Sequence, residues 1–256
     1  MLSTVDIGNT NIKMGFFENE ELKFTFTFST RHSRTADEYA SDLYSLMKVN
    51  GIKKDDIDSC IISSVVPQIN ARICQAFEQV CSVKPLIVGP GVKTGLNIRI
   101  EDPSTLGADL VVACVAANHY YPNPTIVISM GTATVFCVLD KDGNMLGGPI
   151  APGVNISLEA LTKGTALLHS VSLDAPKSVI GKNTDKSIRS GVVWGTACMI
   201  DGMIDKIEAE LGQKCTLVAV GGLSYSIIKN CTHEIEIRPD LIMQGLRLIY
   251  EKNQRK

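Results

Sequence analysis

Apolar residues recur along the chain with two periods, which predict a mixture of strands and helices. Residues 2–30 read as a meander of strands, and the segment from Lys23 to Phe28 alternates apolar and polar residues as a half-buried antiparallel strand does. A helix is expected after Thr35, because Thr35 and Glu38 form a capping box and apolar residues then fall on one face. Short apolar runs predict further strands over 60–66, 85–88, 125–129, 134–139 and 216–220. Helical spacing predicts further helices over 69–80, 103–119, 156–168, 190–211 and 241–252.

Two short segments of the chain are alike, one near the start and one near the middle. Val5-Asp6-Ile7-Gly8-Asn9-Thr10-Asn11 and Ile128-Ser129-Met130-Gly131-Thr132-Ala133-Thr134 each follow an apolar strand and turn at a glycine. Such a turn lets backbone N–H groups and small polar side chains approach an anion closely, because no Cβ intervenes. The repeat predicts two related halves facing each other across a nucleotide, and hence a phosphotransferase. We expect a lobe over 1–121 and a second over 122–256, divided near Pro122-Asn123-Pro124.

Composition narrows the range of partners. The 256 residues carry a formal net charge of −2 with 20% charged residues, which argues against a nucleic-acid or membrane partner. No apolar run approaches the roughly 18 residues that span a bilayer. The start shows no signal peptide, and the eight cysteines form no Cys-x-x-Cys pair, so we expect reduced thiols in a cytoplasmic protein. A hydrophobic content of 45% is high and indicates a large subunit interface.

Several polar residues stand where phosphate chemistry needs them. Asp6 lies two residues before Gly8 at the end of a strand, where a carboxylate suits a Mg²⁺ ion held largely through water. Asn9 and Thr132 are expected to face the phosphates from opposite lobes. Gly221-Gly222 follows a strand and would let adenine and ribose lie against bare backbone.

Asp109, in Gly107-Ala108-Asp109, lies at or just before an expected helix start and allows two interpretations. An aspartate there is most often a helix cap. It could instead be the general base that takes a hydroxyl proton as the γ-phosphoryl group is attacked, since phosphoryl transfer needs such a group.

The order of motifs carries a family resemblance. They are Asp6-Ile-Gly-Asn-Thr10, Ser63-Ser-Val-Val-Pro67, Gly107-Ala-Asp109, Gly131-Thr-Ala-Thr134, Gly147-Gly148 to Gly153, Thr165-Ala166-Leu167, Gly181-Lys-Asn-Thr184, Gly191 to Asp201-Gly202, and Gly221-Gly222. With these motifs in order, the chain resembles the type III pantothenate kinases over essentially its whole length. The resemblance implies an α/β fold, a duplicated ribonuclease H-like (actin-like ATPase) fold with a nucleotide cleft between two lobes. It also implies ATP-dependent phosphorylation of pantothenate, the first step towards coenzyme A, by a homodimer that needs Mg²⁺ and a monovalent cation, K⁺ or NH₄⁺.

The resemblance also implies site residues. ATP contacts are expected at Asp6, Ile7, Gly8, Asn9, Thr10, Asn11, Ile12 and Lys13, with a phosphate contact at Thr132. Asp109 is then the proton acceptor. The pantothenate site is lined by Gly107, Ala108, Asp109 and Leu110, and Thr184 reaches it from the partner subunit.

Three positions depart from the family pattern. Leu110 stands where the family usually has Arg, Ser129 where it has the Asp that binds the monovalent cation, and Ile100 where it has an aromatic residue in the substrate site. A lost Arg removes a charge-assisted contact with a carboxylate worth roughly 1.5–3 kcal/mol. A Ser hydroxyl is a poorer K⁺ ligand than a carboxylate, so the response to K⁺ should be weak. Two alternatives therefore stay open, a kinase for a different small alcohol and a non-catalytic nucleotide-binding regulatory relative.

The helix expected over Ser190–Leu211 carries the dimer prediction. It mixes Gly191, Gly195 and Gly202 with large apolar residues. Small residues let helices approach closely, while the large apolar ones need a partner to cover them. We therefore expect an obligate homodimer through the second half of the chain.

Overall fold

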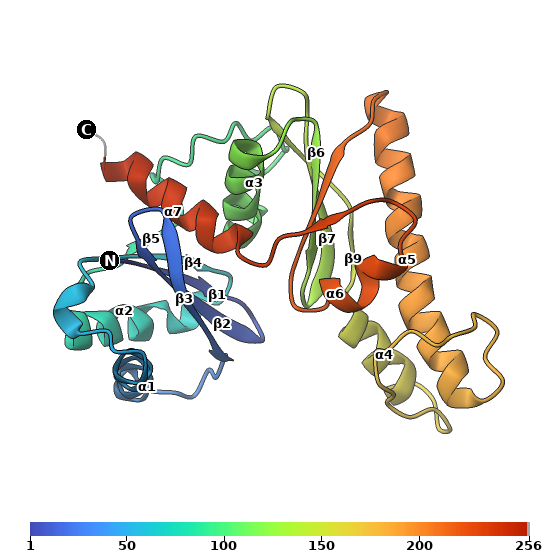
Figure 1. Ribbon diagram of the computed structural model, residues 1–256, viewed down its shortest axis with the longest axis horizontal. Helices are drawn as coiled ribbons and strands as arrows, with labels where there is room; N and C mark the ends of the chain where they lie inside the picture. Colours follow the sequence, from blue (N-terminus) through green and yellow to red (C-terminus); the bar gives the residue numbers. More distant parts are fainter. Residues whose placement is uncertain (255–256) are drawn as a thin grey trace. The chain divides into compact units, whose positions relative to one another are not determined.

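The computed structural model describes residues 1–254, which form two compact α/β units (Figure 1). Unit 1 contains residues 1–95, 104–116 and the chain from Leu241 onward. Unit 2 contains residues 96–103 and 117–240. The chain therefore leaves unit 1 twice, and it returns to it first with residues 104–116 and then with its last helix.

Unit 1 is built on a mixed sheet of five strands. The strands are β1 (Leu2–Ile7), β2 (Asn11–Glu18), β3 (Glu21–Ser29), β4 (Ser59–Ser64) and β5 (Leu86–Ile87). Their order is β3-β2-β1-β4-β5. The first three strands form an antiparallel meander, while β4 and β5 continue the sheet in parallel with β1.

Helices cover both faces of this sheet (Figure 1). Helices α1 (Ala36–Val49) and α2 (Pro67–Cys81) pack on one face through a core that includes Phe16, Leu43 and Phe77. The other face is covered by α7 (Leu241–Gln254) and the first part of α3 (Ala108–Tyr120). The predicted capping box of α1 is confirmed, since Glu38 N–H donates to Thr35 Oγ1 and Thr35 N–H donates to the Glu38 carboxylate.

Unit 2 repeats the strand order of unit 1. Its strands are β6 (Thr125–Met130), β7 (Ala133–Leu139), β8 (Met145–Gly147), β9 (Ile150–Pro152), β10 (Thr216–Val220) and β11 (Glu236–Ile237). The order is β11-β10-β6-β7-β8, with β9 also paired to β7. Here too an antiparallel meander, β6 to β8, is extended by two parallel strands. The predicted duplication is confirmed, and β10 takes the place of β4.

The helices of unit 2 differ in extent from the sequence predictions. Helix α4 (Val154–Lys163) ends at Gly164 instead of reaching 168, and α5 (Thr184–Leu211) begins six residues before 190. The first turn of α5 is polar and exposed, so it lacks the apolar spacing that marks a helix, and the Asn183 side chain caps it by accepting from Lys186 N–H. Helix α3 begins at Ala108, because Pro103–Thr105 forms a separate 3-10 turn. The remaining helical segments are Lys54–Asp56, α6 (Ser224–Ile227) and Ile228–Asn230.

The last helix belongs to a different unit from the one expected. A division at Pro122 groups residues 241–252 with the second half, whereas α7 is part of unit 1. The reason is its apolar face, on which Met243, Leu246 and Ile249 are fully buried against the β1–β4 side of the first sheet. No helix within residues 1–254 is long and apolar enough to cross a membrane.

Candidate active site

The first glycine turn joins β1 to β2 and is held by hydrogen bonds at both ends. Gly8 N–H donates to the Asn11 carbonyl at 2.9 Å. Thr30 fastens the turn to the end of β3, because its hydroxyl donates to the Gly8 carbonyl at 2.6 Å and its N–H donates to the Thr10 carbonyl at 2.9 Å. A Cβ at Gly8 would lie 3.1 Å from the Asn11 carbonyl oxygen, so a side chain fits poorly there. Asn9 and Thr10 are exposed at the tip, where they can meet a ligand.

Asp6 lies on β1 between two polar neighbours. It pairs with Lys13 of β2 and with Ser63 of β4, and paired residues project from the same face of a sheet. The Asp6 Oδ1 atom is buried and has no hydrogen-bond partner in the described part of the chain. Burial, followed by the nearby charge of Asp109, raises the pKa of Asp6 from 3.8 to about 7, although Ser63 and Lys13 oppose the shift.

Asp109 is the second residue of α3 and faces the same site as Asp6. A Cβ at Gly107 would come within 2.5 Å of Asp109 Oδ1, so the glycine leaves room for this carboxyl group. Burial raises the pKa of Asp109, while the backbone N–H groups at the helix start hold it down. Two carboxylates of unit 1 therefore lie close enough for their charges to interact, and each binds its proton more tightly than in water.

These oxygens fit a hydrated Mg²⁺ ion. Mg²⁺ prefers oxygen ligands and usually keeps several of its waters, so one carboxylate with substrate phosphates is a sufficient protein contribution. Within residues 1–254 no cluster of three His, Cys, Asp or Glu side chains could enclose a metal. The buried, unpartnered Oδ1 of Asp6 and the mutual repulsion of Asp6 and Asp109 are both relieved by a cation.

The second glycine turn, in unit 2, gathers the other predicted nucleotide contacts. Gly131 N–H donates to the Ala133 carbonyl at 3.0 Å, and Gly153 N–H donates to the Thr132 carbonyl at 3.1 Å. Gly221 follows β10 with φ +105°, and a Cβ there would lie 2.2 Å from the Met130 carbonyl oxygen. Because β10 pairs with β6, the exposed Thr132 and Gly221-Gly222 lie at the same edge of this sheet.

Ser129 occupies in unit 2 the place that Asp6 occupies in unit 1. Each lies two residues before the turn glycine on the central strand of its sheet. Ser129, however, pairs with Val135 and Val220 where Asp6 pairs with Lys13 and Ser63. The second turn has thus lost the carboxylate and both of its polar neighbours.

The predicted substrate residues fall into both units. Gly107 to Leu110 form the start of α3, where Leu110 N–H donates to the Gly107 carbonyl at 3.1 Å, and this places them with Asp6 in unit 1. Ile100 belongs to unit 2 and lies against Gly147. Thr184 is the exposed first residue of α5, also in unit 2.

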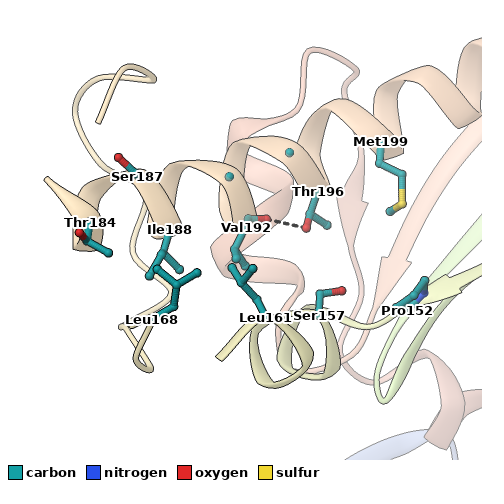
Figure 2. Close-up of a pocket in the computed structure, with 12 residues that line it drawn as sticks. Pro152, Ser157, Leu161, Leu168, Thr184, Ser187, Ile188, Val192, Thr196 and Met199 are labelled. Carbon is teal, nitrogen blue, oxygen red and sulfur yellow. Dashed lines mark hydrogen bonds between the residues drawn. The ribbon is translucent and has the colours of Figure 1, made fainter. Parts of the chain in front are cut away.

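Thr184 lines an open cavity of about 710 Å³ between α4 and α5 (Figure 2). Apolar side chains line much of it, with Leu168 beside Ile188 and Leu161 beside Val192. Gly191 and Gly195 have no side chains, so they leave space for the cavity along α5. The cavity lining therefore combines apolar side chains with the hydroxyl groups of Ser157, Thr184, Ser187 and Thr196.

Two residues of this region have structural roles that sequence reasoning did not assign. Thr30 fastens the first turn from twenty-two residues away, and no local pattern marks it. Ser63 was noted only as part of a motif, and its pairing with Asp6 depends on the register of β4 against β1.

Comparison with solved structures identifies the fold. The chain matches a putative Baf family transcriptional activator from Campylobacter jejuni with TM-score 0.63 and 19% identity, covering 99% of this chain and 100% of that one. It matches the activator of 2-hydroxyisocaproyl-CoA dehydratase from Clostridium difficile, solved with bound ADPNP, with TM-score 0.55 and 13% identity over 100% and 97% of the two chains. At these identities the likeness concerns the fold, and the predicted duplicated, actin-like ATPase fold is confirmed.

Sequence comparison identifies the family. The family model for type III pantothenate kinase matches residues 2–206. Curated type III pantothenate kinases from Roseiflexus sp. (strain RS-1) and Brevibacillus brevis are each 42% identical to the chain, over 254 and 256 residues, covering 99% of it and 100% of their own length. The chain belongs to the type III pantothenate kinase family, and the resemblance predicted from its motifs is confirmed.

Proposed function

We propose that the protein transfers the γ-phosphoryl group of ATP to the primary alcohol of pantothenate, which yields 4′-phosphopantothenate, the first intermediate of coenzyme A synthesis. The observation that carries this proposal is the Asp6–Asp109 pair in a chain that matches pantothenate kinases over its full length. A non-catalytic protein needs neither of these two partly buried carboxylates, each of which has its pKa raised by burial.

Asp109 is the proposed general base. The alcohol oxygen forms a bond to the γ-phosphorus, the bond from that phosphorus to the bridging oxygen of ADP breaks, and the alcohol proton passes to the Asp109 carboxylate. A raised pKa makes this carboxylate a stronger base than a solvated aspartate. The N–H groups at the start of α3 keep it ionised for the task.

The two glycine turns are the proposed ATP contacts. The first turn, Asp6 to Lys13, offers the exposed N–H groups and side chains of its tip, and Lys13 carries a positive charge next to Asp6. Thr132 offers a hydroxyl to a phosphate, and Gly221-Gly222 offers bare backbone to adenine and ribose.

Asp6 is the proposed holder of Mg²⁺ through water. When bound, the ion neutralises the negative charge that develops on the phosphates. The carboxylate orients the hydrated ion, and Lys13 balances the remaining charge.

Ser129 is a poor site for a monovalent cation, because Val135 and Val220 flank it and bring no oxygen from their side chains. We expect K⁺ or NH₄⁺ to bind weakly. The expected rate without these ions is therefore close to the rate with them.

The pantothenate site is proposed at Gly107, Ala108, Asp109 and Leu110, with further proposed contacts from Ile100 and from Thr184 of the partner subunit. At the position where the family usually has an Arg that contacts the substrate carboxylate, this chain has the apolar side chain of Leu110. We expect pantothenate to bind more weakly than where Arg is present. The same substitution favours the second candidate, a kinase for an uncharged small alcohol, which is why the test below includes such alcohols.

The proposed assembly is a homodimer in which Thr184 serves the partner's substrate site. Half of the large apolar side chains that stand exposed lie within residues 150–180, namely Ile150, Ile156, Leu161, Leu167, Val179 and Ile180. A second subunit would cover them. All eight cysteines are free thiols, which supports a cytoplasmic location.

A coupled ADP-release assay tests the proposal. Pantothenate is supplied beside pantetheine, glycerol and no acceptor, each with Mg²⁺ and each with and without K⁺. We expect pantothenate-dependent ADP release with little response to K⁺. Release with an uncharged alcohol but not with pantothenate would establish the second candidate, and release with none of them would leave a nucleotide-binding protein without kinase activity.

A further inference from the structure

The register of β1 against β4 places Ser63 beside Asp6. The two strands run parallel, with Asp6 opposite Ser63 and Ile7 opposite Ser64. Directly opposed residues project from the same face and their strands lie roughly 4.8 Å apart. The Ser63 side chain therefore lies next to Asp6, on the side away from Lys13.

Both side chains bury a polar atom that lacks a partner. Ser63 is 0% exposed, and neither its Oγ atom nor Asp6 Oδ1 forms a hydrogen bond within the described residues. A hydroxyl can donate and a carboxylate oxygen can only accept, so each has what the other lacks. The Ser63 hydroxyl lies near enough to the Asp6 carboxyl to oppose the rise of its pKa.

The second half of the molecule shows what happens where the carboxylate is missing. Ser129 takes the place of Asp6 there, and its partner on the parallel strand is Val220. A serine hydroxyl on the neighbouring parallel strand is thus present in the half that has the Asp6 carboxylate. It is absent from the half that has Ser129 in that place. A role for Ser63 in packing β4 against β1 alone would be served equally well by valine.

We propose that Ser63 is a positioning residue for the metal: its hydroxyl donates to Asp6 Oδ1 and fixes the carboxylate, so that the other oxygen is held towards the hydrated Mg²⁺ of ATP. This inference rests on the proposed function, because it takes Asp6 to hold that ion. Partners of this kind orient metal-binding carboxylates, and their loss typically weakens metal affinity by about 10–100-fold.

Ser3 provides a matched control. It belongs to the same pair of strands, opposite Cys60, and it is also a 0% exposed serine whose Oγ has no hydrogen bond in the described chain. It lies three positions before Asp6 on β1, an odd number, so it projects from the opposite face of the sheet. Ser3→Ala removes an equivalent hydroxyl without touching the Asp6 carboxylate.

The experiment measures Mn²⁺ binding by electron paramagnetic resonance in the presence of a saturating non-hydrolysable ATP analogue. Wild type, Ser63→Ala, Ser63→Cys and Ser3→Ala are compared as folded proteins. We expect the two Ser63 variants to bind Mn²⁺ about 10-fold more weakly or worse, since a thiol keeps the size but is a weak donor. Ser3→Ala should match wild type, and all four should bind the analogue equally in EDTA. If Ser63→Ala fails to fold, Ser63→Cys carries the test.

The outcomes separate this inference from the proposed function. Wild-type Mn²⁺ affinity in both Ser63 variants overturns the positioning role, even where the wild type phosphorylates pantothenate normally. Weakened Mn²⁺ binding in the Ser63 variants supports the positioning role, even where pantothenate proves not to be the substrate. Absence of Mn²⁺ binding to wild type with the analogue overturns both.

Discussion

Asp6 and Asp109 have raised pKa values for related reasons but are suited to different tasks. Asp6 lies on a strand, and its Oδ1 atom is buried without a hydrogen-bond partner in the described chain. Its negative charge is therefore stabilised by a cation. Asp109 lies at a helix start, where N–H groups stabilise its charge against burial. The environment of Asp6 suits its proposed role of holding an ion, and that of Asp109 suits its proposed role of accepting a proton.

Asp109→Asn should abolish catalysis while leaving ATP binding intact. An amide cannot take the alcohol proton, so kcat should fall by about 10²-fold or more. Binding of the ATP analogue, measured by calorimetry, should stay near the wild-type value.

Asp37→Asn is the control for this prediction. Asp37 is likewise the second residue of a helix, following Ala36 in α1 as Asp109 follows Ala108 in α3. If both aspartates only stabilise helix starts, the two variants lose similar stability and neither loses activity. A near-normal kcat for Asp109→Asn would remove it from the role of base.

Asp6→Asn should stabilise the metal-free protein at neutral pH and above. The folded protein holds the Asp6 proton up to about pH 7, while the unfolded chain loses it near 3.8, so the free energy of unfolding falls as pH rises between these values. The variant escapes this loss. We expect a gain on the order of 2 kcal/mol at pH 8, discounted for partial exposure, that vanishes towards pH 4.

Urea unfolding in EDTA at a series of pH values measures this gain. A gain of equal size at pH 4 and pH 8 would show that packing, and not the buried charge, is its source.

At the scale of the element, the two glycine turns are easier to predict from the sequence than the segments that pack around them. Gly8 and Gly131 mark the two turns in the sequence, because strand residues precede each glycine and small polar residues follow it. The capping box that starts α1 is equally local. These features depend on neighbours in the chain, so sequence reasoning could find them.

Features that depend on register or distant packing escaped it. Thr30 fastens the first turn only because β3 ends beside it, and Ser63 meets Asp6 only in one register of β4. The polar start of α5 has no apolar period, and its cap at Asn183 looked like part of a loop. Helix α7 was assigned to the wrong compact unit because the sequence does not say which sheet its apolar face covers.

Gly221→Ala should disrupt the end of β10, whereas Gly222→Ala should not. Gly221 has φ +105° and its Cβ would lie 2.2 Å from the Met130 carbonyl oxygen, while a Cβ at Gly222 meets nothing within 4 Å. We expect Gly221→Ala to lower the free energy of unfolding by about 2 kcal/mol or more. Urea unfolding of both variants decides the matter. Equal losses would mean that β10 can shift away from β6 to admit the side chain.

At the scale of the whole molecule, the two sheets have one strand order and different chemistry. Unit 1 keeps the charged groups, Asp6, Lys13 and Asp109, while the equivalent strand positions of unit 2 are Ser129 and Val135. Duplication thus supplies two glycine turns, and only the turn of unit 1 has the acidic residues beside it. Six of the exposed large apolar side chains lie within residues 150–180, in the second half of the chain.

The protein should be a dimer in solution. Light scattering at micromolar concentration should give twice the mass of the chain, because the apolar cavity and exposed side chains beside α5 need a cover. Gly195→Glu places a charge in the cavity lining and should produce monomers. Ala209→Glu, near the far end of the same helix and outside the cavity lining, is the control. A monomeric wild type would contradict the assembly and with it the role of Thr184 towards a partner.

The most direct test of the central claim follows phosphorus itself. ATP, Mg²⁺ and pantothenate are incubated with the protein and observed by ³¹P nuclear magnetic resonance. The account predicts that the γ-phosphate signal disappears as ADP forms and that a phosphomonoester signal appears, split into a triplet by the neighbouring methylene protons. An unchanged ATP spectrum, or the signals of ADP and inorganic phosphate without a phosphomonoester, would contradict it.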